Sequence, residues 1–333
     1  MTRLSGDLWS SLSADTPAVD ASPQAFAEQV RYYLTQSPRQ LPSRYLYDAL
    51  GSALFDAICE LPWYAVTRGE MRLLRAHARE ILDAMHPRTR IIELGAGNGR
   101  KLEMLLASAL PAAHVQEVHL IDVSPQALRT ASDALNGFGH VRVHRHQATY
   151  EAGLQRLATG PRSTERSLLL FLGSNIGNFD PPAANALLLQ IRAALQPGDG
   201  FLIGADLVKP EQALLLAYDD PLQVTAAFNR NLLVRINREL DANFDLKGFG
   251  HRAVWNRHES RVEMHLVSTR PQFVVIPAAH LSLQFEPGET IWTESSYKYE
   301  PQTLIGQLLA AGFGLQKQWV DQQARFALTL LTV

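Results

Sequence analysis

Short apolar runs alternate with helical patterns between residues 90 and 205, and this alternation constrains the fold more than any other feature of the sequence. The run at 167–172 is strongly apolar, as a strand buried on both faces of a parallel sheet requires. The predicted strands are 90–94, 117–123, 141–144, 167–172 and 201–205, and the helices predicted between them are 101–110, 125–136 and 181–195. Such alternation predicts a parallel α/β sheet covered by helices.

The alternation stops near Asp206, and a different pattern follows. Residues 210–240 look helical, and 251–293 contain several predicted strands. A helix at 301–311 precedes two strands in hairpin order, 315–320 and 326–333. A hairpin after a βα series is typical of the class I methyltransferase sheet, in which the last strand is antiparallel. The predicted fold class is therefore α/β, a doubly wound sheet of this kind with a second, mixed α+β part.

A glycine-rich turn follows the first predicted strand, in the segment Glu93-Leu94-Gly95-Ala96-Gly97-Asn98-Gly99. Glycine is needed where the backbone approaches a ligand closely. The nicotinamide fingerprint has a third glycine where this chain has Arg100. The spacing G-x-G-x-G after an acidic residue is more typical of S-adenosylmethionine (SAM) sites. Asp122, at the end of the second strand, could accept both ribose hydroxyls. The alternatives are a tight turn with no ligand and a structural role for Glu93.

Composition and charge exclude several classes of partner. The 333 residues suggest two domains or one large domain with an insertion. The net charge of −2 provides no attraction to polyanions, so neither nucleic acid nor a membrane surface is expected as a partner. Neither a signal peptide nor an apolar run long enough to span a membrane is apparent, which predicts a soluble, cytoplasmic protein. The single cysteine, Cys59, excludes an intramolecular disulfide and reads as a small core residue.

Histidines gather in two places, and neither has the spacing of a known metal motif. His144-Arg145-His146 form one group, and His251, His258 and His265 form a series. No carboxylate stands at zinc-protease spacing beside them. No metal site is therefore expected.

Several long and rare segments resemble the histidine-specific N-alpha-methyltransferases of ergothioneine biosynthesis, from about residue 38 to residue 333. The matching segments are Tyr47-Asp48-Ala49-Leu50-Gly51-Ser52, Leu61-Pro62-Trp63-Tyr64, Thr67-Arg68, Glu93-Leu94-Gly95, Phe171-Leu172-Gly173-Ser174-Asn175-Ile176-Gly177-Asn178, Asp206-Leu207-Val208-Lys209, Ala217-Tyr218-Asp219-Asp220, Phe228-Asn229-Arg230-Asn231, Glu263-Met264, and Thr293-Glu294-Ser295-Ser296 with Lys298.

The resemblance implies two domains and a small-molecule substrate. Residues 73–207 and 297–333 would form the SAM-binding methyltransferase domain, and 15–72 with 208–296 a discontinuous substrate-binding domain. Residues 1–14 would form a loose arm. The implied reaction is methylation of the α-amine of L-histidine, through its mono- and dimethyl forms, to the trimethylated betaine. A monomer is expected.

The resemblance also implies roles for individual residues. Cofactor-binding positions would be Tyr64, Gly95, Gly97, Lys101, Asp122, Thr149 and Tyr150, with Lys101 pairing with the methionyl carboxylate. The amino-acid end of histidine would be held by Tyr47, Asn178 and Tyr218, with Tyr47 and Asn178 as the catalytic pair. The remaining substrate positions would be Phe55, Tyr64, Gly173, Met264, Glu294 and Ser296, of which Glu294 and Ser296 would bind the imidazole nitrogens.

Two positions depart from the family pattern. Ala65-Val66 stand where the family has a tyrosine and a proline, so the rim of the pocket is expected to differ. Thr149, followed by Tyr150, stands where many members place an acidic residue for the adenine amine.

Each site residue also has a plainer interpretation. Asn178 could cap the helix that begins near Pro181. Tyr47 and Tyr64 could be interfacial core residues, and Tyr218 a surface aromatic. Glu294 could be a solvated charge, and Met264 simple core packing. For the whole chain, the alternatives are a methyltransferase acting on another amino acid or small amine, a SAM-binding regulatory module, and a nicotinamide oxidoreductase.

Overall fold

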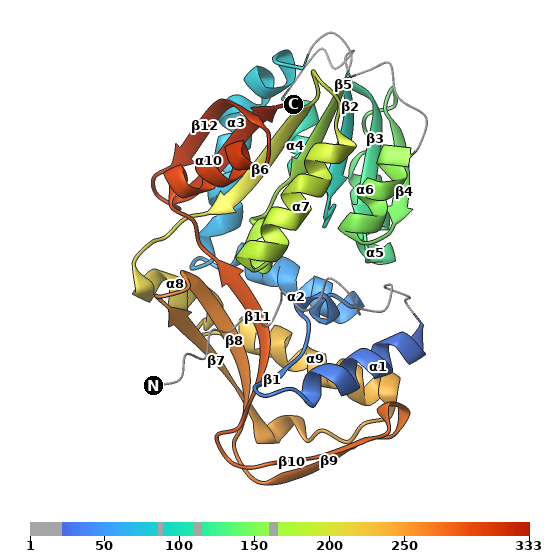
Figure 1. Cartoon of the computed structure of the whole chain (residues 1–333), viewed down its shortest axis with the longest axis vertical. Coiled ribbons are helices and arrows are strands. Elements are labelled where there is room, and N and C mark those ends of the chain that lie inside the picture. The colour runs from blue at the N-terminus through green and yellow to red at the C-terminus, as the bar shows by residue number, and fades with distance from the viewer. Residues whose placement is uncertain (1–21, 86–88, 109–114, 160–165) are drawn as a thin grey trace.

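The computed structural model describes residues 22–85, 89–108, 115–159 and 166–333, and the expected arm at 1–14 lies outside these ranges. Two sheets dominate the fold, one in the upper and one in the lower half of the molecule (Figure 1). None of the helices in the described ranges combines the length and the hydropathy needed to cross a membrane.

The larger sheet has seven strands in the order β12-β13-β6-β5-β2-β3-β4. Its strands are β2 (Thr89–Leu94), β3 (Val115–Asp122), β4 (Arg142–Gln147), β5 (Arg166–Phe171), β6 (Gly200–Asp206), β12 (Gly314–Asp321) and β13 (Phe326–Thr332). Strands β2 to β6 are parallel to one another, and β13 pairs antiparallel with both β6 and β12. This is the class I methyltransferase arrangement, with the antiparallel last strand that the sequence predicts.

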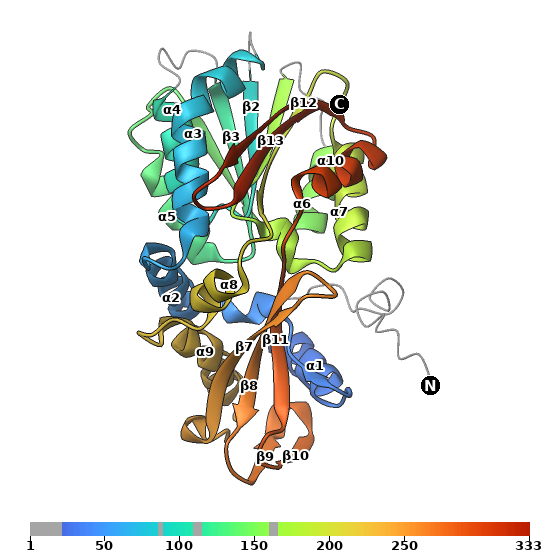
Figure 2. The same ribbon diagram turned by 90° about the vertical axis from the view of Figure 1, so that its left-hand side faces the viewer.

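Helices cover both faces of this sheet (Figure 2). One face packs against α3 (Ala65–Asp83), α4 (Arg100–Ala107) and α5 (Pro125–Ala134), and the other against α6 (Tyr150–Thr159), α7 (Pro181–Ala194) and α10 (Pro301–Ala310). The strand residues alternate between the two cores, because Ile91 joins the first and Ile92 the second.

The smaller sheet has four strands in the order β1-β11-β8-β7. They are β1 (Arg39–Gln40), β7 (Phe249–Asn256), β8 (Arg261–Ser268) and β11 (Thr290–Tyr297), and the hairpin β9 (Gln272–Ile276) and β10 (Leu281–Phe285) forms a separate pair. Helices α1 (Pro23–Leu34), α2 (Ala49–Glu60), α8 (Glu211–Tyr218) and α9 (Val224–Leu240) complete this part. The N-terminal segment thus joins the segment after Asp206, since β1 pairs with β11.

Three details differ from the sequence-based expectations. Helix α6 was not predicted, because Gly153 weakens the helical signal; in the structure a Cβ at that position would lie only 2.6 Å from Ile121 Cγ2. The stretch 210–240 divides into α8 and α9, since the Asp220 carboxylate accepts hydrogen bonds from Val224 N and Thr225 N at 3.1 and 2.7 Å. The expected domain boundary at 72/73 falls inside the continuous helix α3.

Candidate active site

A pocket between the two sheets brings together all nine residues expected to bind the substrate. They are Tyr47, Phe55, Tyr64, Gly173, Asn178, Tyr218, Met264, Glu294 and Ser296. They come from the first helices of the chain, from the segment after β5, and from the insertion after Asp206. Val66, expected at the rim, also lines this pocket, together with six residues for which no role is predicted: Ile58, Ser174, Asn175, Ala217, Thr225 and Phe228.

Aromatic rings form one wall of the pocket. Tyr47 contacts Phe55 and Phe228 edge to face, each with ring centroids 5.5 Å apart. Tyr64 meets Tyr218 in the same way at 6.3 Å. Burial raises the pKa of the Tyr47 and Tyr64 hydroxyls well above the ordinary value, and the neighbouring Glu294 carboxylate adds to the effect on Tyr47. Both phenols are therefore neutral hydrogen-bonding groups at physiological pH.

Glu294 and Ser296 lie two positions apart on β11 and both line the pocket. The interpretation of Glu294 as a solvated surface charge is wrong, because its side chain is partly buried and lines the pocket. Burial raises the pKa of its carboxyl to about 7, although Lys298 lowers it. Ser296 Oγ accepts hydrogen bonds from Tyr218 Oη at 2.8 Å and from Lys298 Nζ at 2.9 Å. Tyr218 is buried rather than on the surface.

Asn178 ends the 3₁₀ turn Asn175–Asn178 that follows β5. The interpretation of this residue as a helix cap is wrong, because Asp180 caps α7 by accepting a hydrogen bond from Ala183 N at 2.8 Å. The segment before the turn is held by a hydrogen bond from Asp206 N to Ser174 Oγ at 2.9 Å. Asn178 is thus left to face the pocket.

The glycine turn adopts a conformation that favours glycine, with φ angles of 80°, 52° and 76° at Gly95, Gly97 and Gly99. A Cβ on Gly99 would lie 2.7 Å from Ala131 Cα, so helix α5 packs directly on this turn. Nothing lies within 4 Å of where a Cβ on Gly97 would be, so the backbone there borders open space.

Asp122 lies beside this turn, as the sequence predicts. Gly97 N donates to Asp122 Oδ2 at 3.4 Å, and Ser124 N donates to Oδ1 at 2.8 Å. Burial raises the pKa of Asp122, whereas these backbone N–H groups lower it. The cradle therefore fits a ligand that brings hydroxyl donors to a held carboxylate.

Glu93 at the base of the turn is 2% exposed, and its Oε2 has no hydrogen-bond partner among the residues that the structure describes. Burial raises the pKa of this carboxyl to about 8, although Lys101 lowers it. A buried acidic oxygen without a partner fits a site that receives a cationic ligand.

Glu70 was not identified from the sequence, yet it joins the turn to the pocket. Its fully buried carboxylate accepts from Gly173 N at 2.8 and 2.9 Å and forms an ion pair with Lys101 Nζ at 2.5 Å. The only sequence signal is a carboxylate on the otherwise apolar stripe of α3. Lys101, expected to pair with a ligand carboxylate, is thus held beside Gly173 by Glu70.

Thr149 and Tyr150 lie at the start of α6. Thr149 Oγ1 accepts a hydrogen bond from Ala152 N at 3.3 Å, so its hydroxyl caps this helix. Tyr150 reaches the glycine turn, because a Cβ on Gly95 would lie 2.9 Å from Tyr150 Oη.

A histidine cluster lies apart from the pocket, on β3 and β4. Ligand atoms of Glu117, His119 and His144 all lie within 4.8 Å of one another. Arg142 already forms an ion pair with Glu117 at 2.7 Å, and His146 forms a hydrogen bond with His119 at 3.0 Å. The sequence did not reveal this grouping, because it forms across two parallel strands.

Comparisons with known proteins agree with this geometry. The model of the family described as "Histidine-specific methyltransferase, SAM-dependent" matches residues 26–333. The histidine N-alpha-methyltransferase of Mycolicibacterium smegmatis is 39% identical over 314 residues, which is 94% of this chain and 96% of that protein. The protein of the same name from Mycobacterium tuberculosis is 38% identical over 312 residues, 93% of this chain and 96% of that protein.

A fungal protein, ergothioneine biosynthesis protein 1 of Schizosaccharomyces pombe, is 29% identical over 304 residues, 88% of this chain but 39% of that protein. The match of the family model to nearly the whole chain agrees with the sheet order, the glycine turn and the composition of the pocket. The chain belongs to the SAM-dependent, histidine-specific methyltransferases.

Proposed function

We propose that this chain methylates the α-amine of L-histidine in three successive rounds that end at the trimethylated betaine. The observation that carries the proposal is the pocket itself. Residues from the N-terminal helices, from the turn after β5 and from the smaller sheet meet there, and they bring amide and phenol groups together with the pair Glu294 and Ser296. Such a pocket suits an amino acid whose ring carries both a hydrogen-bond donor and an acceptor.

We further propose that the two parts of the fold divide the work. Residues 73–207 and 297–333 would hold SAM, and residues 15–72 with 208–296 would supply most of the substrate contacts, with α3 shared between the two. Candidate cofactor contacts are Gly95, Gly97, Lys101, Asp122, Thr149 and Tyr150, with Tyr64 between the two ligands. When bound, SAM supplies an electrophilic methyl group on a sulfonium sulfur.

The chain's own residues would position the amine. The nucleophile has to be a neutral amine, and a carboxylate beside it would keep it protonated. Among the pocket-lining residues the one carboxylate is Glu294, which we assign to the ring rather than to the amine. Asn178 and Tyr47 offer neutral oxygen acceptors instead. Orientation by such groups can provide up to about 7–11 kcal/mol of barrier reduction in favourable cases.

The first test is to incubate the purified protein with labelled SAM and each of the twenty amino acids, and to weigh the products. Transfer to histidine, continuing to three methyl groups, is the expected result. A product that stops at one methyl would contradict the successive rounds, and transfer to another amino acid in preference to histidine would overturn the proposed substrate.

The second test addresses the ring contacts. Ser296→Ala and Glu294→Ala should lower activity on histidine and relax selectivity towards amino acids with apolar or aromatic rings, because a site built on hydrogen bonds discriminates by about 10⁴ or more. Ser295→Ala is the matched control, since Ser295 is a neighbour on β11 that does not line the pocket. Glu294→Ala protein that methylates histidine as well as the parent would exclude the proposed ring contact.

A further inference from the structure

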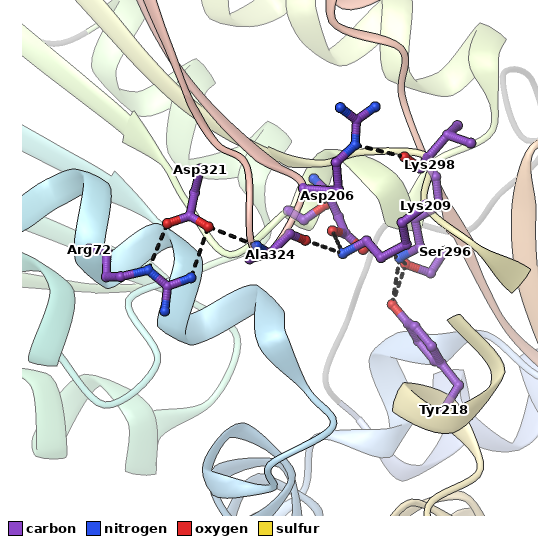
Figure 3. Close-up of polar contacts among 11 residues, drawn as sticks. Arg72, Asp206, Lys209, Tyr218, Ser296, Lys298, Asp321 and Ala324 are labelled. Atoms are coloured by element: carbon purple, nitrogen blue, oxygen red, sulfur yellow. Dashed lines mark hydrogen bonds and ion pairs between the residues drawn. The ribbon is translucent and has the colours of Figure 1, made fainter. Parts of the chain in front are cut away.

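Lys298, just beyond β11, is a fully buried ammonium whose hydrogen-bonding capacity is used completely. Its Nζ lies 2.7 Å from Tyr218 Oη, 2.9 Å from Ser296 Oγ and 2.9 Å from Asp206 Oδ2. An ammonium has three N–H donors and no acceptor. Each donor therefore has one partner, and the position of the side chain is fixed. Figure 3 shows Lys298, Ser296, Tyr218 and Asp206 gathered in one polar cluster.

Lys298 keeps its proton despite this burial. Burial alone would lower the pKa of Lys298, but the Asp206 carboxylate, Tyr218 and the hydrogen bonds to both raise it. Asp206 is itself held by a second ammonium, since Lys209 Nζ lies 2.6 Å from its Oδ1 and 2.6 Å from Ala324 O. The cation beside Ser296 is therefore permanent under working conditions.

This cation donates to both hydroxyls at the pocket surface, and the bond between the two hydroxyls runs from Tyr218 to Ser296. Tyr218 Oη accepts from Lys298 and donates to Ser296 Oγ. Ser296 Oγ accepts from both Tyr218 and Lys298, which occupies the two lone pairs of a hydroxyl. Its own proton is given to no partner within the described part of the chain. Ser296 lines the pocket, so this proton remains for the ligand.

We propose that Lys298 is a positioning residue that, together with Tyr218, holds Ser296 as a hydrogen-bond donor to the substrate ring. A ring nitrogen at Ser296 then has to be an acceptor, and the ring N–H has to face Glu294. The pocket would thus take one neutral tautomer of an azole ring, and would reject the same ring when the nitrogen at Ser296 is replaced by C–H. This inference rests on the proposed function and deepens it.

The test compares histidine with its two pyrrole analogues, pyrrol-2-ylalanine and pyrrol-3-ylalanine. Each analogue keeps one ring N–H and replaces the other nitrogen by C–H, and the amino-acid end is unchanged. The measured quantity is the ratio of kcat/KM for histidine to that for each analogue. The parent should favour histidine by about 10-fold to 100-fold over the better analogue, because a buried Ser296 donor would lack its acceptor.

Lys298→Met should lower this ratio by about tenfold, because Ser296 regains a free lone pair and its hydroxyl can turn. Lys209→Met is the matched control, since it also removes an ammonium from Asp206 but contacts neither Tyr218 nor Ser296. That control should lose stability and keep the ratio. Loss of a merely structural ion pair would lower kcat/KM for all three substrates together and leave the ratio as it was.

A second variant covers the case in which Lys298→Met does not fold. Tyr218→Phe removes the other donor to Ser296 and should also lower the ratio, whatever it does to activity as a whole. If activity is too low to measure, calorimetric binding of the same substrates in the presence of S-adenosylhomocysteine gives the same comparison. A parent that neither methylates nor binds histidine refutes the proposed function. A parent that does, with an unchanged ratio in Lys298→Met or Tyr218→Phe, refutes the role of Lys298 alone.

Discussion

Replacing Glu93 by glutamine should stabilise the cofactor-free protein, and the gain should grow with pH. In the folded chain the pKa of the Glu93 carboxyl is raised by burial from its ordinary value of 4.5 to about 8. Between those two values the folded state keeps a proton that the unfolded state has released. The folded state binds more protons, so stability falls as pH rises through this window.

The magnitude follows from the two pKa values. A rise from 4.5 to about 8 corresponds to at most about 5 kcal/mol at about 1.36 kcal/mol per pH unit. Glu93→Gln keeps the shape and cannot ionise, so its advantage over the parent should be near zero at about pH 5 and reach about 2–5 kcal/mol at about pH 9. The lower limit allows for relaxation of the nearby Lys101 side chain.

Urea unfolding of both proteins without SAM, at several pH values between these limits, measures the difference directly. Glu103→Gln is the matched control, since Glu103 is an exposed carboxylate in the first turn of α4. It should give no pH-dependent gain. A constant difference between Glu93→Gln and the parent across the range would refute the reasoning, because it would mean that Glu93 ionises equally in the folded and unfolded states.

Asp122→Ala should weaken SAM binding by about 1.5–3 kcal/mol, the range for hydrogen bonds to a charged group, and unchanged affinity by calorimetry would exclude the assignment. Gly99→Ala should destabilise the fold by more than about 2 kcal/mol, because a left-handed φ costs about 1–2 kcal/mol and the new Cβ would lie 2.7 Å from Ala131 Cα. Gly97→Ala meets no such contact, so it should unfold at a higher urea concentration than Gly99→Ala, and equal midpoints would contradict this. Turnover at limiting histidine should rise from neutral to mildly alkaline pH, since a free α-amine titrates near pH 8 and the pKa of Glu294 is about 7; a flat profile would remove the free-amine mechanism.

The sequence predicts the methyltransferase sheet well because its signals are local. The central parallel strands β2, β5 and β6 are short apolar runs, and the turn after β2 carries glycines at the positions where the structure has positive φ. Helix α6 was not predicted from the sequence. Gly153 lets this helix pack closely on β3, and such a tertiary contact cannot be read from local sequence. Helix propensity accounts only for the unfavourable free energy of a glycine inside a helix.

The candidate site likewise contains residues that the sequence predicts and residues that it does not. Nine substrate positions could be transferred from the family pattern, and all nine line one pocket. Glu70 could not be identified in this way, and for Lys298 the family pattern gave the residue but not its role. Their partners, Gly173 and Asp206, lie far away in the sequence, and a buried charge cannot be inferred without knowing what compensates it.

The alternation of β11 has an evolutionary consequence. Glu294 and Ser296 share one face of this strand, and Lys298 follows at the next alternate position. The proposed contacts to the ring are thus encoded mainly in a few codons of a single strand, apart from the segment that forms the glycine turn. Mutations in β11 can accumulate without changing the glycine turn. Descendants of such a protein can therefore come to methylate new substrates while they keep the same methyl donor.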